Sequence, residues 1–171
     1  MPRNVEIKAR VRDMTALHAA AAEVATGDSV VLHQHDVFYR VECGRLKLRR
    51  FPDGPAELIR YQRPDASGPK TSDYDIFRTD DGQGLHDLLA AALGIRGEVV
   101  KKRTLVMAGR TRIHLDEVEN LGDFMELEVV LEDDEDDEVG GAEARELMEK
   151  LGIGPADLVT GAYLDMLESG I

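Results

Sequence analysis

The residues best suited to chemistry are acidic side chains that recur at every second position near one end of the chain. Glu126 and Glu128 flank Leu127, and in an extended strand they lie on one face about 7 Å apart. Both carboxylates can then reach one divalent metal, and Asp116 from a neighbouring segment can supply a third oxygen ligand. Hard oxygen ligands suit Mg²⁺ or Mn²⁺, although an acidic pair at this spacing is also common on a solvated strand.

Basic side chains recur with the same alternation along other segments. Guanidinium forks match phosphate oxygens in pairs, so such rows favour a polyphosphate ligand. Enclosing this much unpaired charge would be costly unless a polyanion and a metal balanced it. The ordinary alternative is a sheet whose polar face is exposed to water. The residues that share this parity are Lys8, Arg10, Lys47, Arg49, Lys101, Arg103, Arg110 and Arg112, together with the acidic Glu6.

Alternation of polar and apolar residues with period two predicts about eight strands. Most are expected to form antiparallel pairs, with turns at residues 42–44 and 108–109. The predicted strands cover residues 5–11, 30–40, 45–49, 58–62, 74–78, 99–107, 110–118 and 124–131.

Helical periodicity predicts four helices, at residues 14–25, 85–93, 142–151 and 162–167, with Asp13 as the N-cap of the first. Their apolar stripes need a partner, and the apolar face of the strands is available. The charged face then points away from the helices, and closure of the sheet removes its edges. We therefore predict an α+β fold in which residues 1–171 form one domain, a closed antiparallel β-barrel with helices packed outside and a charged lumen.

The composition limits the class of ligand. The 171 residues carry a formal net charge of −13, which repels nucleic acid and anionic membranes. Trp is absent, which disfavours a stacking platform for single-stranded nucleic acid. Cys43 is the only cysteine, and the sequence has no signal-peptide core and no membrane-length apolar stretch. We expect a cytoplasmic protein that binds a triphosphate-bearing small molecule and neither nucleic acid nor a membrane.

Several short motifs occur in a defined order along nearly the whole chain. They are Asn-Val-Glu-Ile-Lys at 4–8, His-Asp-Val-Phe-Tyr at 35–39, Gly-Arg-Leu-Lys-Leu-Arg at 44–49, Val-Val-Lys-Lys-Arg at 99–103, Arg-Ile-His-Leu-Asp-Glu-Val at 112–118, Leu-Gly-Asp-Phe at 121–124 and Glu-Leu-Glu at 126–128. This set resembles the CYTH, or triphosphate tunnel metalloenzyme, superfamily, which includes class IV adenylyl cyclases, thiamine triphosphatases and inorganic triphosphatases. The residues of these motifs are most similar to those of the class IV adenylyl cyclase-like branch.

The resemblance implies a tunnel that holds a triphosphate midway, and it points to a homodimer. It implies that the metal ligands are Glu6, Asp116, Glu126 and Glu128. It implies that the phosphate ligands are Lys8, Lys47, Arg49, Arg60, Lys101, Arg103 and Arg112, to which we add Arg10 from the basic row. We assign catalytic roles to Glu6, Lys8 and Arg112. The family hallmark is E-x-E-x-K, and Asn4 replaces its first Glu; because Asn cannot act as a base at neutral pH, the number of metals stays open.

Other features have plainer interpretations. Residues 68–71, Gly-Pro-Lys-Thr, look like the end of a phosphate loop but lack its upstream glycine spacing, so we expect a flexible loop from which Lys70 can reach a phosphate. His33 and His35 are expected to be structural, and Tyr163 to be a packing residue. His114 lies on the charged row, where it can orient groups or transfer a proton. The acidic run 132–138 is interpreted as a solvated or disordered loop.

Three functions remain open from the sequence. The first is a cyclase that converts ATP to cyclic AMP and pyrophosphate, using Mg²⁺ or Mn²⁺. The second is a triphosphatase acting on inorganic triphosphate, thiamine triphosphate or a nucleotide. The third is a non-catalytic sensor of triphosphate or polyphosphate, which the loss of a carboxylate at Asn4 motivates.

Overall fold

The computed structural model describes the backbone of residues 3–62 and 70–170 and the side chains of residues 3–62 and 73–170. Gly68 and Pro69 of the 68–71 motif, and the side chains of Lys70 and Thr71, therefore lie outside the described part of the chain. In chain order the elements are β1 (Arg3–Arg10), α1 (Met14–Val24), β2 (Val30–Tyr39), β3 (Arg45–Arg50), β4 (Ala56–Gln62), β5 (Lys70–Thr79), α2 (Gly82–Leu93), β6 (Ile95–Ala108), β7 (Thr111–Val118), β8 (Gly122–Leu131), α3 (Asp137–Lys150), a 3₁₀ turn (Pro155–Asp157) and α4 (Tyr163–Ser169).

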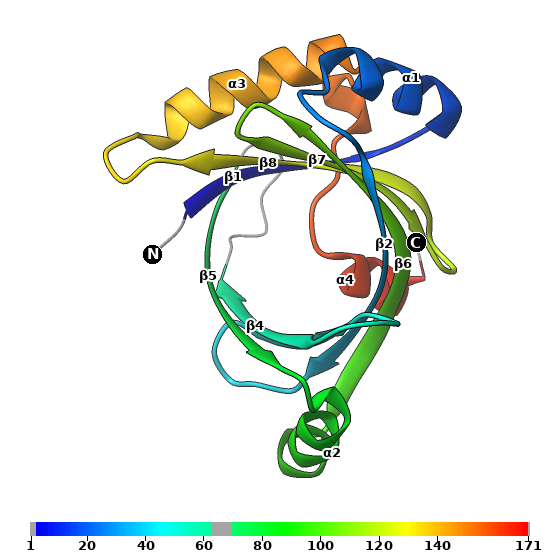
Figure 1. Cartoon of the computed structure of the whole chain (residues 1–171), viewed down its shortest axis with the longest axis vertical. Helices are drawn as coiled ribbons and strands as arrows, with labels where there is room; N and C mark the ends of the chain where they lie inside the picture. Colours follow the sequence, from blue (N-terminus) through cyan, green and yellow to red (C-terminus); the bar gives the residue numbers. More distant parts are fainter. Residues whose placement is uncertain (1–2, 63–69, 171) are drawn as a thin grey trace.

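The eight strands form a closed antiparallel barrel in the order β1-β5-β4-β3-β2-β6-β7-β8, with β8 paired to β1 (Figure 1). This confirms the predicted fold. Because successive side chains of a strand point to opposite faces, the charged rows of β1, β2, β3, β6, β7 and β8 turn inward and the opposite rows turn outward. Closure gives each of the eight described strands a partner on both sides and converts the charged face into the wall of a lumen.

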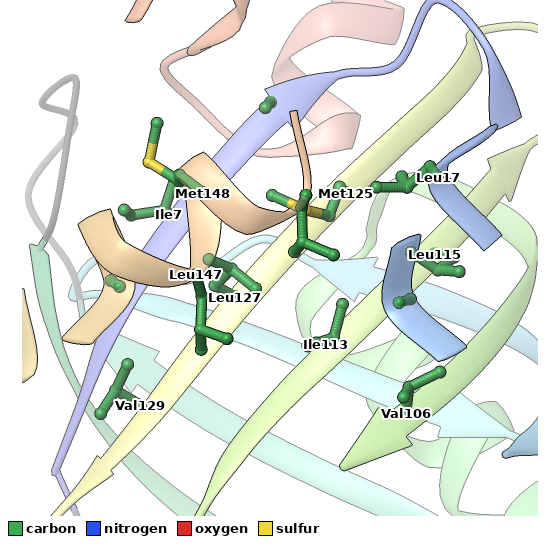
Figure 2. Packing of buried hydrophobic residues seen from close by; sticks show 14 of the residues in the cluster. Ile7, Leu17, Val106, Ile113, Leu115, Met125, Leu127, Val129, Leu147 and Met148 are labelled. Carbon is green, nitrogen blue, oxygen red and sulfur yellow. The ribbon is translucent and has the colours of Figure 1, made fainter. Parts of the chain in front are cut away.

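Helices α1 and α3 cover the outer face of β1, β7 and β8. Their apolar residues pack with the outward row of those strands in one buried cluster, and Figure 2 shows Ile7, Leu127 and Leu147 meeting between the strands and α3. Helix α3 approaches closely because of Gly140: a Cβ there would lie 2.7 Å from Val5 Cγ2. The apolar stripes of the helices therefore bury the outer face, as the sequence predicted.

Helices α2 and α4 pack at other places on the barrel. Leu85 and Leu89 of α2 pack against a buried cluster that includes Val37 of β2 and Leu48 of β3. Helix α4 lies across one end of the ring of strands (Figure 1), where Tyr163 joins buried residues of β2, β4, β6, β7 and β8. Within the described ranges, no helix is both long enough and apolar enough to cross a membrane.

The acidic run 132–138 is not simply a loop, which corrects the sequence interpretation. Helix α3 begins inside the run, and the Asp136 carboxylate caps it by accepting hydrogen bonds from the backbone N–H groups of Glu138 and Val139 at 3.0 and 3.1 Å. Acidic residues in a first helical turn also interact favourably with the helix dipole. Arg110 then pairs with Glu135 and Glu143, so the run is fixed to the β6–β7 turn.

A charged lumen as the candidate active site

The lumen contains a cavity of about 480 Å³ lined by side chains from all eight strands and by Ala162 and Tyr163 at the start of α4. That volume is typical of small-molecule sites. Strand alternation explains the lining, because it sends the polar parity of β1, β2, β3, β6, β7 and β8 inward. The cavity is therefore the place where the sequence-predicted charges converge.

One wall of the lumen, on β2, β3 and β6, is positive. The Asp36 carboxylate, 1% exposed, is contacted by three cations. Arg49 donates from Nε and Nη2 to its two oxygens at 2.8 Å each, Lys47 Nζ lies 3.0 Å from Oδ2, and Lys101 Nζ lies 3.2 Å from the same oxygen. Burial alone would raise the pKa of Asp36, but Arg49, Lys101 and Lys47 hold that pKa well below its usual range. Three cations thus share one ionised carboxylate.

The adjoining wall, on β7, β8 and β1, carries the carboxylate pair. Lys8 Nζ lies 3.1 Å from Glu126 Oε1, and Arg112 Nε donates to Glu128 Oε2 at 2.9 Å. Burial would raise the pKa of Glu126, but Lys8 and Arg103 hold it well below its usual range. The pKa of Glu128 is likewise lowered against burial, by His114 and Arg112. Both carboxylates are therefore ionised at neutral pH and can act as metal ligands.

His114, Glu126 and Glu128 form the group that fits a metal ion. One ligand atom from each lies within 4.8 Å of the others. His114 Nδ1 is buried without a hydrogen-bond partner among the described residues, and it lies 3.8 and 3.7 Å from the two carboxylates. A buried, unsatisfied nitrogen beside two anions suits a shared cation. From the sequence we expected His114 only to orient groups or transfer a proton. The sequence signal for this grouping was its position on the same strand face as Arg112, and the strand register then places it opposite Glu126.

Asp116 does not join that group, and its role as a metal ligand stays a prediction. Its oxygens accept from Arg103 Nε and Nη2 at 2.7 and 2.6 Å and from the Tyr163 hydroxyl at 2.6 Å. Arg103 also donates to Glu126 Oε2 at 2.9 Å. Asp116 therefore orients the Arg103 guanidinium. Tyr163, which was predicted only to pack, both packs and lines the cavity.

The first strand places its motif as the sequence predicted. Glu6 and Lys8 line the cavity, and Glu6 lies opposite Glu128 in the β1–β8 register. Lys8 Nζ lies 4.0 Å from the centre of the Tyr163 ring. Asn4 is also buried in the wall, and with its amide oxygen turned toward Arg112 it accepts a hydrogen bond from Nη2 at 3.2 Å. Asn4 thus satisfies the Arg112 guanidinium rather than adding a carboxylate.

Three predicted cations lie outside the lumen. On β4 the inward positions are Ile59 and Tyr61, so Arg60 points outward, where its half-exposed side chain pairs with Asp75 at 3.4 Å. Arg10 is exposed and lies 5.0 Å from the Phe124 ring, and Arg110 lies in the β6–β7 turn. The remaining predicted cations are brought together in the cavity. Asp36, which the sequence analysis quoted in a motif without a role, is the main residue that it missed; its parity with Gln34 and Phe38 was the available signal.

Comparisons with known proteins agree with this arrangement. A family model described as the CYTH domain matches residues 2–163. The PH1012 protein from Pyrococcus horikoshii OT3 superposes with a TM-score of 0.84 at 20% sequence identity, over 95% of this chain and 98% of that one. A candidate adenylate cyclase from Vibrio parahaemolyticus gives 0.74 at 20% identity, over 96% and 97%.

A candidate adenylyl cyclase from Hippeastrum, described as having a dominant triphosphatase activity, gives a TM-score of 0.69 at 14% identity, over 99% of this chain and 96% of that one. At these identities the structures show a shared fold. A search of curated proteins finds no match to the chain.

Proposed function

The chain belongs to the CYTH domain family, and from this membership and the two charged walls of the lumen we propose that it is a divalent-metal-dependent triphosphatase. The observation that carries the proposal is one cavity lined both by a positive wall around Asp36 and by the carboxylate–histidine group of His114, Glu126 and Glu128. Such a cavity can bind phosphate oxygens on one side and a metal ion on the other. The Hippeastrum protein, with its dominant triphosphatase activity, supports this assignment.

The proposed roles follow from the contacts. Lys47 and Arg49 of β3 and Lys101 and Arg103 of β6 bind phosphate oxygens from one wall. Lys8 of β1 and Arg112 of β7 bind them from the other. Glu126, Glu128 and His114 would hold Mg²⁺ or Mn²⁺, with Glu6 beside Glu128. The bound ion would polarise a phosphoryl oxygen and lower the pKa of a coordinated water. In the reaction a water oxygen bonds to the terminal phosphorus while the bond from that phosphorus to its bridging oxygen breaks.

The architecture favours attack at the terminal phosphate. Helix α4 lies across one end of the barrel, and Tyr163 joins the cavity wall there. A triphosphate that enters from the other end therefore places its terminal phosphate deepest. Phosphoryl transfer depends mainly on positioning and on stabilisation of developing charge, so the surrounding cations suffice without a nucleophilic side chain.

A cyclase is the second candidate, and one observation favours it. Three residues add apolar surface to the cavity lining: Leu32 of β2, Leu105 of β6 and Phe51 directly after β3. Strands β3, β2 and β6 are neighbours in the barrel. A nucleoside could pack on that surface, and the Vibrio parahaemolyticus neighbour is a candidate adenylate cyclase. In that reaction the ribose 3′-hydroxyl attacks the α-phosphorus and pyrophosphate leaves.

The test is a product assay with tripolyphosphate, thiamine triphosphate and ATP, each with Mg²⁺ and with Mn²⁺. We expect orthophosphate, and Glu128→Gln should reduce the rate about 100-fold. Glu117→Gln is the matched control, because Glu117 lies on β7 and pairs with Lys102 on the outer surface at 2.8 Å. Cyclic AMP with pyrophosphate would instead establish the cyclase. Binding without turnover would reject both enzymes and leave a sensor.

A further inference from the structure

The cluster around Asp36 contains more positive charge than its one carboxylate can balance. Lys47, Arg49 and Lys101 all contact Asp36 within 3.2 Å. Lys47 and Lys101 share the single oxygen Oδ2, and Arg49 reaches it as well. The Lys101 side chain is only 2% exposed, so water contributes little to its solvation. A fully protonated cluster would therefore keep two uncompensated charges in a buried place, which is costly.

The cluster can lower this cost if one of its lysines loses a proton, which its arginine cannot do. A guanidinium keeps its proton in proteins, whereas a buried lysine releases its proton readily. Of the two lysines, Lys101 is the more deeply buried and has the longer contact to Asp36. Burial, helped by Arg49, Arg103 and Lys47 and opposed by Asp36, lowers the pKa of Lys101 to about 7. The pKa of Lys47 is also lowered, first by burial and then by Arg49.

We propose that Lys101 is a proton-linked phosphate ligand, which shares its proton with solvent in the ligand-free protein and takes up a full proton when a phosphate group binds beside the Asp36 cluster. The proposal rests on the proposed function in one respect, namely that a triphosphate enters this lumen. A phosphate adds negative charge where the cluster lacks it, so protonation of Lys101 and ligand binding support each other. Asp36 then acts as a positioning residue, because it holds the cations of the two strands paired with β2, namely β3 and β6, close together.

The groups that face Lys101 from each packed element set this balance. Asp36 lies on β2, Lys47 and Arg49 on β3, Asp116 on β7, and the Tyr163 ring of α4 lies 5.8 Å away. Arg103, on the same strand as Lys101, adds a further positive charge. Above neutral pH the ligand-free cluster loses the Lys101 proton, and ligand binding must then include its uptake. Protonation of Lys101 should therefore make the affinity for a phosphate ligand decrease as the pH rises above neutral.

The test measures binding of tripolyphosphate by calorimetry with EDTA present, from pH 6.5 to 8.5, so that turnover does not interfere. The proteins compared are wild type, Lys101→Arg, and the matched control Lys102→Arg, whose target side chain points outward and pairs with Glu117. Protonation of tripolyphosphate itself is common to all three proteins and cancels in ratios of affinity. The affinity of Lys101→Arg relative to wild type should rise about tenfold from pH 7.5 to 8.5, and that of Lys102→Arg should not change.

Two further measurements keep the proposal falsifiable if Lys101→Arg fails to fold. Calorimetry of the wild type in buffers of different ionisation enthalpy should show proton uptake at pH 8 that Asp36→Asn shifts to lower pH. Lys47→Arg should leave the wild-type pH dependence in place. A constant affinity ratio for Lys101→Arg, or loss of the dependence in Lys47→Arg instead, would overturn the assignment while leaving the proposed function intact. Failure of tripolyphosphate to bind at any pH would overturn both.

Discussion

At the scale of single residues, the hydroxyl of Tyr163 connects α4 to the charged wall. It donates to Asp116 Oδ2 at 2.6 Å, and burial raises its pKa well above the usual range, so it keeps the proton that it donates. Tyr163→Phe removes this bond to a buried carboxylate and should lower the free energy of unfolding by about 2 kcal/mol, measured by urea denaturation.

Tyr39→Phe is the matched control for that change. The Tyr39 hydroxyl bonds with His86 Nδ1 at 2.9 Å in a partly buried place, so its loss should cost about 1 kcal/mol or less. An equal loss in the two variants would mean that the ionised partner adds nothing to the Tyr163 bond. A change in the affinity for tripolyphosphate in Tyr163→Phe alone would further place the hydroxyl in the site.

The sequence allowed much of the site to be predicted residue by residue, because parity in a strand determines which face a side chain occupies. Glu126, Glu128 and Lys8 reached the lumen for this reason. Arg60 did not, because the inward row of β4 is apolar near α4, where Ile59 and Tyr61 pack with that helix. At the end of the barrel that α4 covers, polar side chains therefore no longer face the lumen at every second position of the strand. The bonds of Asp116 to Arg103 and Tyr163 depended on contacts between distant segments, which parity cannot supply.

At the scale of elements, the Asp165 carboxylate ties the start of α4 to the barrel. Asp165 Oδ2 accepts from Arg45 Nη2 at 2.8 Å, its Oδ1 accepts from Arg96 Nη2 at 2.9 Å, and Oδ2 also accepts from the N–H of Ala162 at 2.9 Å. Arg45 and Arg96 lie on β3 and β6, so Asp165 fixes the start of the helix to two strands. The pKa of Asp165 is lowered against burial by these partners.

Asp165→Ala should therefore loosen α4 before the rest of the fold. We expect faster hydrogen exchange of the amides in residues 162–169 and a loss of about 1–2 kcal/mol in the free energy of unfolding. Glu168→Ala is the control, because Glu168 is exposed and pairs only with Arg96 among the described residues. If exchange in α3 rose as much as exchange in α4, the ion pairs would be stabilising the molecule as a whole and not this helix.

The helices also show what could be predicted from the sequence at this scale. Periodicity placed α1 and α2 within a few residues, and Asp13 caps α1 by accepting from the N–H of Ala16 at 3.0 Å. Helix α3 begins five residues earlier than predicted, since Asp137 replaces residue 142 as its start. The two glycines before Ala142 concealed that start, and they are tolerated because Gly140 lies against Val5 and Leu131. Close packing between layers, rather than local propensity, decides that boundary.

At the scale of the whole molecule, buried charge makes stability depend on pH in two separate ranges. Neighbouring cations hold the pKa values of Asp36 and Glu126 well below their usual range. Their contribution is therefore present above the unfolded-state pKa of about 4 and is lost as the pH falls through the folded-state values. Lys101 behaves differently, because its folded-state pKa of about 7 lies below its ordinary value of 10.5. Between those values the unfolded chain binds more protons, so stability increases with pH.

We therefore expect the free energy of unfolding to rise from pH 3 to 5, to change little up to pH 7, and to rise again from pH 7 to 9. The second slope should approach about 1.4 kcal/mol per pH unit at most, measured by urea denaturation at each pH. Lys101→Arg should remove most of the second rise, because an arginine stays charged in both states, and Lys102→Arg should retain it. A flat profile above pH 7 in the wild type would show that Lys101 keeps its proton in the folded protein. The buried wall would then carry its excess charge at a constant cost to stability.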